Sequence, residues 1–234
     1  MRKSRKRVLG QHFIKTGFLK ELVSFLDVKG KSVIEIGVGR GSLTKKIAPL
    51  VKTLKGYEKD LYLYRIAKKE LEPYKNVKIV LGDALGDCPN SFDLVIGNLP
   101  FSISSRFIEW LILCNIKRAV VILQKDFVDK LLAKPGDKKY VALSVLARYF
   151  YSIKPLLIIP PSWFSPSPKV YSTLVEFIRK RENGEARKLI EDMGKIFSTK
   201  KKLAKSVLGK DAPAKRIYEL EPEILCELVT RKCR

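Results

Sequence analysis

The sequence has little cysteine, one histidine and no long apolar run. Its four cysteines are Cys88, Cys114, Cys226 and Cys233, without a CxxC pair, and its histidine is His12. Structural zinc sites need closely spaced Cys and His ligands, so this pattern argues against a metal. The basic start lacks the apolar stretch of a secretion signal, so we expect free thiols and no disulfide. No apolar run reaches the roughly 18 residues of a bilayer span, so we expect a cytoplasmic protein without a membrane partner.

Acidic residues are scarce relative to basic ones. Lys and Arg number 47 against 24 Asp and Glu, which gives a formal net charge of +23. Such an excess favours a polyanionic partner, either nucleic acid or an anionic membrane surface. A heat-adapted surface is the alternative, because Gln occurs only at positions 11 and 124. Heat adaptation usually adds Glu together with Lys, however, so it does not explain a one-sided excess.

Hydrophobic periodicity predicts alternating strands and helices along most of the chain. Short apolar runs predict strands at 33–36, 53–57, 77–81, 92–96, 119–123, 153–159 and 170–178. This alternation predicts an α/β fold with a doubly wound, mostly parallel seven-stranded sheet. Only helical patterns follow residue 180. We therefore expect a larger α/β domain, 1–180, and a small all-helical domain, 181–234.

Polar residues follow the first three predicted strands, at the edge where open parallel sheets bind ligands. The first strand runs into a glycine-rich turn, 35–41, where glycines allow a ligand to approach the backbone closely. The second ends in Glu58, which could accept hydrogen bonds from ribose hydroxyls or could be an ordinary solvated carboxylate. The third ends in Asp83, which could read an adenine amino group or simply cap a helix. Singly these signals are weak, but together they favour a nucleotide-like ligand.

The segment Asn98-Leu99-Pro100-Phe101 follows the fourth predicted strand and is the most informative motif. The exocyclic amine of adenine is a weak nucleophile, because its lone pair is delocalised into the ring. The Asn98 side-chain oxygen and the Leu99 carbonyl could accept its two hydrogens. Pro100 would stiffen the turn, and Phe101 could stack on a flipped base. A plain Asn/Pro turn with a core Phe is the alternative, which the preceding glycine turn and carboxylates disfavour.

These residues closely resemble the rRNA adenine N6,N6-dimethyltransferases of the small ribosomal subunit. The likeness covers roughly residues 7 to 209. The matching segments are 10–13, 35–41, Glu58, 82–84, 97–101, 124–125, 160–162, 164–170, Phe197 and 200–202. The resemblance implies a class I methyltransferase fold, S-adenosylmethionine as cofactor, and rRNA of a small-subunit precursor as substrate during ribosome biogenesis.

The resemblance also implies roles for individual residues. Gln11, His12 and Ile14 would border the cofactor, with His12 positioning a lid loop. Asn98 would sit between cofactor and target, and Phe164 would form a second wall of the base pocket opposite Phe101. The cofactor set implied by motif position is completed by Glu35, Gly37, Gly39, Gly41, Glu58, Asp83 and Ala84.

Two basic runs are candidates for RNA docking. They are the N-terminal Arg5, Lys6 and Arg7 and the C-terminal Lys200, Lys201, Lys202 and Lys205. Any one of these lysines could equally belong to a solvated surface, but as a set they predict salt-dependent RNA binding. The helical tail after residue 180 is short for the family, so docking outside the active site could differ. We expect a monomer.

Three alternatives stay open at this point. The nearest is a large-subunit rRNA adenine methyltransferase of the antibiotic-resistance type, although the start at Gly10-Gln11-His12 and the variant Leu99 favour the small-subunit group. A non-catalytic assembly factor on the same scaffold is the second. A DNA adenine methyltransferase is the third and weakest.

Overall fold

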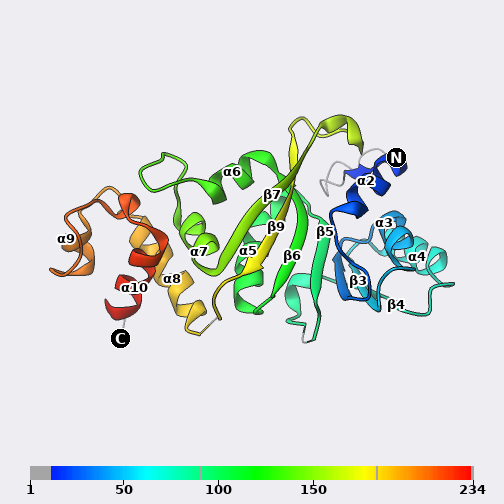
Figure 1. The fold of residues 1–234 in the computed structure, drawn as a ribbon, viewed down its shortest axis with the longest axis horizontal. Coiled ribbons are helices and arrows are strands. Elements are labelled where there is room, and N and C mark those ends of the chain that lie inside the picture. The colour runs from blue at the N-terminus through cyan, green and yellow to red at the C-terminus, as the bar shows by residue number, and fades with distance from the viewer. Residues whose placement is uncertain (1–11, 90, 183, 233–234) are drawn as a thin grey trace.

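A seven-stranded sheet forms the centre of the protein. The computed structural model describes residues 12–89, 91–182 and 184–232 (Figure 1). The strand order is β4-β3-β2-β5-β6-β9-β7, and β9 alone runs against its neighbours β6 and β7. The strands are β2 (Ser32–Ile36), β3 (Thr53–Glu58), β4 (Val77–Leu81), β5 (Leu94–Asn98), β6 (Arg118–Gln124), β7 (Tyr151–Ile159) and β9 (Ser172–Arg179). The predicted doubly wound, mostly parallel sheet is confirmed.

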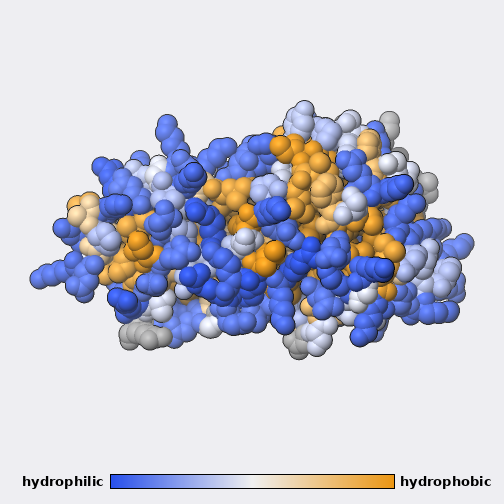
Figure 2. All heavy atoms as spheres, viewed as in Figure 1, coloured by the Kyte–Doolittle hydropathy of each residue, from blue (hydrophilic) through white to orange (hydrophobic). Residues whose placement is uncertain are grey.

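Helices pack on both faces of this sheet, because apolar side chains alternate between the two faces along each strand. In β6, Val120 and Ile122 belong to the cluster that α2 and α3 cover, whereas Val121 belongs to the cluster beneath α5 and α7. The helices are α2 (Leu19–Ser24), α3 (Ser42–Ile47), α4 (Leu61–Glu70), α5 (Ser104–Leu113), α6 (Lys125–Leu132), α7 (Ala142–Phe150), α8 (Ala186–Phe197), α9 (Ala204–Leu208) and α10 (Pro222–Lys232). Figure 2 shows hydrophilic side chains over most of this view, with apolar ones gathered over its middle.

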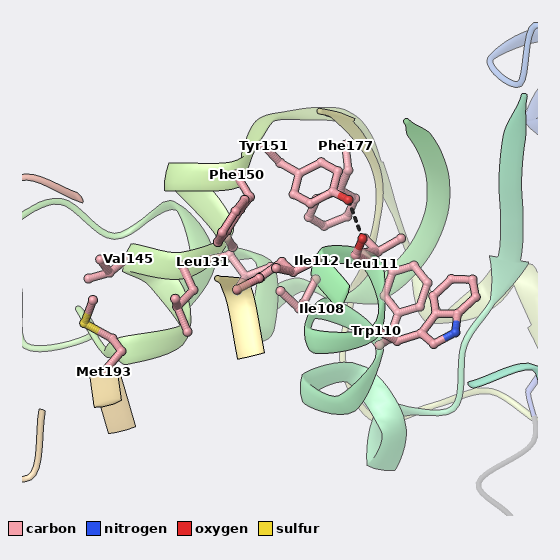
Figure 3. Close-up of a cluster of buried hydrophobic side chains, with 14 of the residues drawn as sticks. Ile108, Trp110, Leu111, Ile112, Leu131, Val145, Phe150, Tyr151, Phe177 and Met193 are labelled. Carbon is pink, nitrogen blue, oxygen red and sulfur yellow. Dashed lines mark hydrogen bonds between the residues drawn. The ribbon is translucent and has the colours of Figure 1, made fainter. Parts of the chain in front are cut away.

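The C-terminal helices share a core with the sheet. Figure 3 shows Met193 of α8 and Val145 of α7 in the same cluster as Tyr151 and Phe177 from the sheet. The Tyr151 hydroxyl donates to the Leu111 carbonyl at 2.7 Å. The described residues after 182 form helices and no strand, as predicted. A domain boundary at residue 180 stays a prediction.

No helix within the described segments combines the length and the apolar character needed to cross a bilayer.

The expectation of free thiols is wrong for two cysteines. Cys88 and Cys114 form a disulfide with their Cα atoms 5.0 Å apart. The two cysteines are 26 positions apart in the sequence, so their spacing did not reveal this pairing. The residues between them run through β5 and back along α5, which returns the chain to its starting point. Cys226 is free and buried, and Cys233 lies outside the described residues.

A second, two-stranded sheet was not predicted. β1 (Phe13–Ile14) pairs with β8 (Phe164–Ser165) in antiparallel register. Both strands have two residues, too short for alternation to be recognised in the sequence. The pairing matters for the site, because it joins the start of the described chain to the loop between β7 and β9.

Candidate active site

The strand order reverses between β2 and β5, and a cavity opens beyond the carboxyl ends of these strands. Its volume is about 1000 Å³, at the upper end for ligand pockets in proteins. Ile36 of β2 pairs with Gly97 of β5 just below it. A Cβ on Gly97 would lie 2.7 Å from the Ile36 carbonyl oxygen, so a glycine here allows the two strands to meet closely. Most of the predicted cofactor and catalytic residues line this cavity, namely His12, Gly37, Gly39, Glu58, Asp83, Ala84, Asn98, Leu99, Pro100, Phe101 and Phe164.

Glu58 ties the glycine turn to the end of β3. The side chain is 6% exposed, so the alternative of a solvated carboxylate is wrong. Its Oε2 accepts from the Gly39 amide at 2.8 Å, and its Oε1 accepts from the Asp60 amide at 2.9 Å. Gly39 has a φ of 61°, a left-handed conformation that aims its N–H at this carboxylate. The second lone pair of each oxygen is left for a ligand in the cavity.

Asp83 caps a helix, one of the two roles that its sequence position left open, and it also lines the cavity. Its Oδ1 accepts from the Leu85 amide at 3.1 Å and so caps the short helix at 84–86. Its Oδ2 accepts from Lys59 Nζ at 3.1 Å and from Arg106 Nη1 at 2.9 Å. Partial burial works against ionisation, but these three hydrogen bonds outweigh it and lower the pKa of Asp83. A carboxylate that stays ionised is a good acceptor for a ligand amino group.

Glu35 does not line the cavity; its side chain instead contacts α3, the helix that follows the glycine turn. It is 2% exposed, and its Oε2 accepts from Thr44 Oγ1 at 2.7 Å. Burial raises the pKa of Glu35 to about 8; the hydrogen bond from Thr44 opposes the rise, and the negative charge of Glu58 adds to it. Ile14 and Gly41 also lie outside the cavity lining, with Ile14 packed against the core. The predicted Gln11 lies outside the described residues.

Asn98 is the last residue of β5, and its side-chain amide is held in one orientation. Its Nδ2 donates to the His12 carbonyl at 2.5 Å. Because a carbonyl only accepts, the nitrogen must face His12, and the Asn98 Oδ1 is left as an acceptor. The next residue is also fixed, since the Leu99 amide donates to the Ile122 carbonyl at 3.2 Å. The beginning of the Asn98–Phe101 motif is therefore anchored to both the N-terminal segment and β6.

The N-terminal segment and the loop after β7 close one side of the cavity together. His12 Nδ1 lies 2.7 Å from the Pro166 carbonyl, so this nitrogen carries a proton. Beside this contact, β1 pairs with β8, which holds the buried Phe164 in the cavity wall. The rings of His12 and Phe101 are 6.1 Å apart. His12 thus contacts the segments that carry Asn98, Phe101 and Phe164, which are far apart in the sequence.

Several lining residues were not predicted. They are Phe13, Ile36, Tyr57, Lys59, Asp60, Leu61, Tyr62, Leu63, Arg65, Gly82, Ser102, Ile103, Pro168 and Ser172. Asp60 could have been found, because an Asp that precedes a predicted helix is a typical N-cap. It accepts from the amides of Tyr62 and Leu63 at 2.8 and 3.0 Å. Arg106, which contacts Asp83, left no signal, since only the packing of α5 brings it there.

The predicted RNA-docking lysines lie away from the cavity. Lys200, Lys201 and Lys202 lie in the turn between α8 and α9, and Lys205 lies in α9, at the opposite end of the molecule from α4 (Figure 1). The Lys200 ammonium donates to the Tyr140 carbonyl at 3.2 Å, so this lysine has a structural contact. Lys201, Lys202 and Lys205 are exposed. The predicted Arg5, Lys6 and Arg7 lie outside the described residues.

Comparison with known proteins agrees with this geometry. The model of the family "Ribosomal RNA adenine dimethylase" matches residues 2–211. The chain belongs to this family. It is an S-adenosylmethionine-dependent rRNA methyltransferase, as the resemblance of its motifs implied.

Individual relatives support the assignment. A Pyrobaculum islandicum protein named "Probable ribosomal RNA small subunit methyltransferase A" is 35% identical, over 98% of this chain and 99% of its own. A dimethyladenosine transferase from Plasmodium falciparum superimposes with a TM-score of 0.81 at 25% identity, covering 95% of this chain and 98% of its own. The 23S rRNA methyltransferase ErmE shares the fold, with a TM-score of 0.67 at 20% identity, covering 95% and 100%.

Proposed function

We propose that the protein transfers methyl groups from S-adenosylmethionine to N6 of adenines in a small-subunit rRNA loop, giving N6,N6-dimethyladenosine. The observation that carries this proposal is the fixed amide of Asn98. Its Oδ1 stands at a cavity that also presents Glu58 and Asp83, two acceptors suited to a nucleoside.

The carboxylate side of the cavity fits the cofactor. Glu58 would accept from the ribose hydroxyls, Asp83 would accept from the adenine amine, and the turn at Gly37 and Gly39 would lie under the methionine portion. His12 would border the cofactor at the opposite edge. When bound, S-adenosylmethionine supplies an electrophilic methyl group on a sulfonium sulfur.

The Asn98 side of the cavity fits a flipped adenine. The Asn98 Oδ1 and the Leu99 carbonyl would accept the two hydrogens of the amine, which directs its lone pair toward the methyl donor. Phe101 and Phe164 would hold the ring between them. Orientation of two reactants can supply about 7–11 kcal/mol of a barrier, so no metal or covalent intermediate is needed. For the second transfer, the same contacts must also accommodate an amine that already carries one methyl group.

The helical region, 181–234, is proposed to dock RNA through the exposed Lys201, Lys202 and Lys205, together with the arm at Arg5, Lys6 and Arg7. The logarithm of the RNA-binding constant should fall linearly with the logarithm of the salt concentration. Each phosphate of single-stranded RNA that a lysine or arginine neutralises should add about −0.7 to that slope. A binding constant that does not change between low and high salt would contradict this part of the proposal.

A large-subunit rRNA target is the rival function, since ErmE has the same fold. The extent of the match to the Pyrobaculum relative, nearly end to end, favours the small subunit. Transfer of labelled methyl groups to isolated small subunits, with large-subunit rRNA as the parallel substrate, separates the two. Label in small subunits supports the proposal, and label only in large-subunit rRNA overturns it.

A further inference from the structure

Exposed aromatic side chains are rare among the described residues, and each lies in the lining of the cavity or next to a lining residue in the sequence. Among the described residues, only Tyr62 and Tyr171 are large aromatic residues with exposed side chains, at 54% and 53%. Tyr62 lines the cavity on the side of Glu58 and Asp60. Tyr171 is not part of the cavity lining itself but immediately precedes the lining residue Ser172, next to the mouth-side segment that also contributes Pro168.

Tyr171 is held by its main chain, while its ring is left open. The Lys125 amide donates to the Tyr171 carbonyl at 3.0 Å, and Ser172 pairs with both Gln124 and Ile159. Within the described part of the chain, its ring makes no aromatic contact and its hydroxyl no hydrogen bond. A tyrosine on a fixed backbone has few rotatable bonds, so it loses little entropy when a planar partner stacks on it.

The surroundings of Tyr171 carry positive charge. Lys169, two residues earlier, is exposed and makes no ion pair with the other described residues. The main chain of Lys125 lies next to that of Tyr171, because the two residues share a hydrogen bond. The Lys125 ammonium itself is paired with Asp129 at 2.8 Å. An open ring next to an unpaired cation suits a nucleobase with its phosphate better than an apolar protein segment.

We infer that Tyr171 is a stacking platform for the nucleotide next to the methylated adenine. This inference rests on the proposed function, because it takes the cavity beside Ser172 as the pocket for the flipped base. An adenine that enters the cavity leaves its neighbour unstacked at the rim. Unpaired bases of RNA are typically held by stacking on aromatic side chains, and Tyr171 is the exposed aromatic residue next to the lining residue Ser172.

The test uses the full-length protein and a single-stranded RNA oligonucleotide that contains one adenine. Two versions carry 2-aminopurine, one on the 5′ and one on the 3′ side of that adenine. Stacking on Tyr171 should quench the fluorescence of one version. Tyr171→Ala should abolish this quenching and weaken binding about 5- to 150-fold, the range for loss of one aromatic–base stack. Tyr171→Phe keeps the ring and should bind like the wild type.

Ile178→Ala is the matched control, because Ile178 is 46% exposed at the other end of β9. In calorimetry, the wild type and the three variants, Tyr171→Ala, Tyr171→Phe and Ile178→Ala, should all bind S-adenosylhomocysteine with the same affinity. The inference is overturned if Tyr171→Ala binds the oligonucleotides as tightly as Ile178→Ala does, or if the wild type binds but quenches neither label. A wild type that binds no RNA contradicts the proposed function itself, and the inference then fails with it.

Discussion

The two sides of the cavity are built in different ways. The side that faces the proposed cofactor comes from successive strand ends, 35–41, Glu58 and Asp83, within about fifty residues of chain. The side that faces the proposed adenine joins Asn98 and Phe164, which come from distant parts of the chain and meet at the N-terminal segment that contains His12. Local sequence thus determines the cofactor side, whereas the adenine side exists only when the N-terminal segment and the loop after β7 have docked.

This difference predicts how the two sides respond to change. Substitutions on the cofactor side should weaken cofactor binding and leave the contacts to the adenine unchanged. Damage to the adenine side should reduce turnover without affecting cofactor affinity. The following predictions test that separation, from the largest expected effect to the smallest.

Asn98→Ala should lower kcat about 10²- to 10³-fold, a loss typical for removal of one preorganised hydrogen-bonding group. The affinity for S-adenosylhomocysteine, measured by calorimetry, should stay within about threefold, since that is ordinary scatter for an indirect effect. Asn98→Asp should also lose most activity, because a carboxylate cannot donate to the His12 carbonyl. An unchanged kcat in Asn98→Ala would remove Asn98 from the mechanism.

The Cys88–Cys114 disulfide joins the chain that follows Asp83 to the end of α5 and should stabilise the fold. Cys88 follows the segment that carries Asp83, and Cys114 follows α5. Closing a loop of this length should contribute about 3–4 kcal/mol to the free energy of unfolding. Cys88→Ser should lose this amount in a denaturant titration, and reductant should destabilise the wild type but not the variant. A wild type indifferent to reductant would show that the bridge adds no stability.

Glu58→Ala should weaken cofactor binding about 10- to 100-fold, because hydrogen bonds to a charged group contribute about 1.5–3 kcal/mol. Its kcat at saturating cofactor should change far less than that of Asn98→Ala. Glu58→Gln, which keeps the shape and one acceptor, should show a smaller loss of affinity. The separation of the two sides is wrong if Glu58→Ala lowers kcat as much as Asn98→Ala does.

Glu35 should make stability depend on pH. Its pKa is about 8 in the folded protein and 4.5 in the unfolded chain, so the folded state binds the proton more tightly. The stabilisation is complete below pH 4.5 and is lost as the pH rises from about 4.5 to 8, at up to about 1.4 kcal/mol per pH unit. Glu35→Gln cannot ionise, so its free energy of unfolding should fall less over this window. Parallel curves for the two proteins would exclude this role of Glu35.

The sequence was sufficient to predict the sheet, its seven strands and the presence of Glu58, Asp83 and the glycine turn at one edge of it. These features depend on hydrophobic alternation and on turns whose residues are neighbours in the chain. It did not reveal the β1–β8 pairing, the Asn98–His12 hydrogen bond or the Arg106–Asp83 contact, because each joins segments whose proximity only the packed fold creates. The disulfide was missed for the same reason.

Nucleoside mass spectrometry of undermethylated small subunits after incubation with the protein and S-adenosylmethionine tests the central claim most directly. The account predicts N6,N6-dimethyladenosine with the wild type and almost none with Asn98→Ala, although both bind the cofactor. Methylation at another atom, no methylation by the wild type, or equal product from both proteins would contradict it.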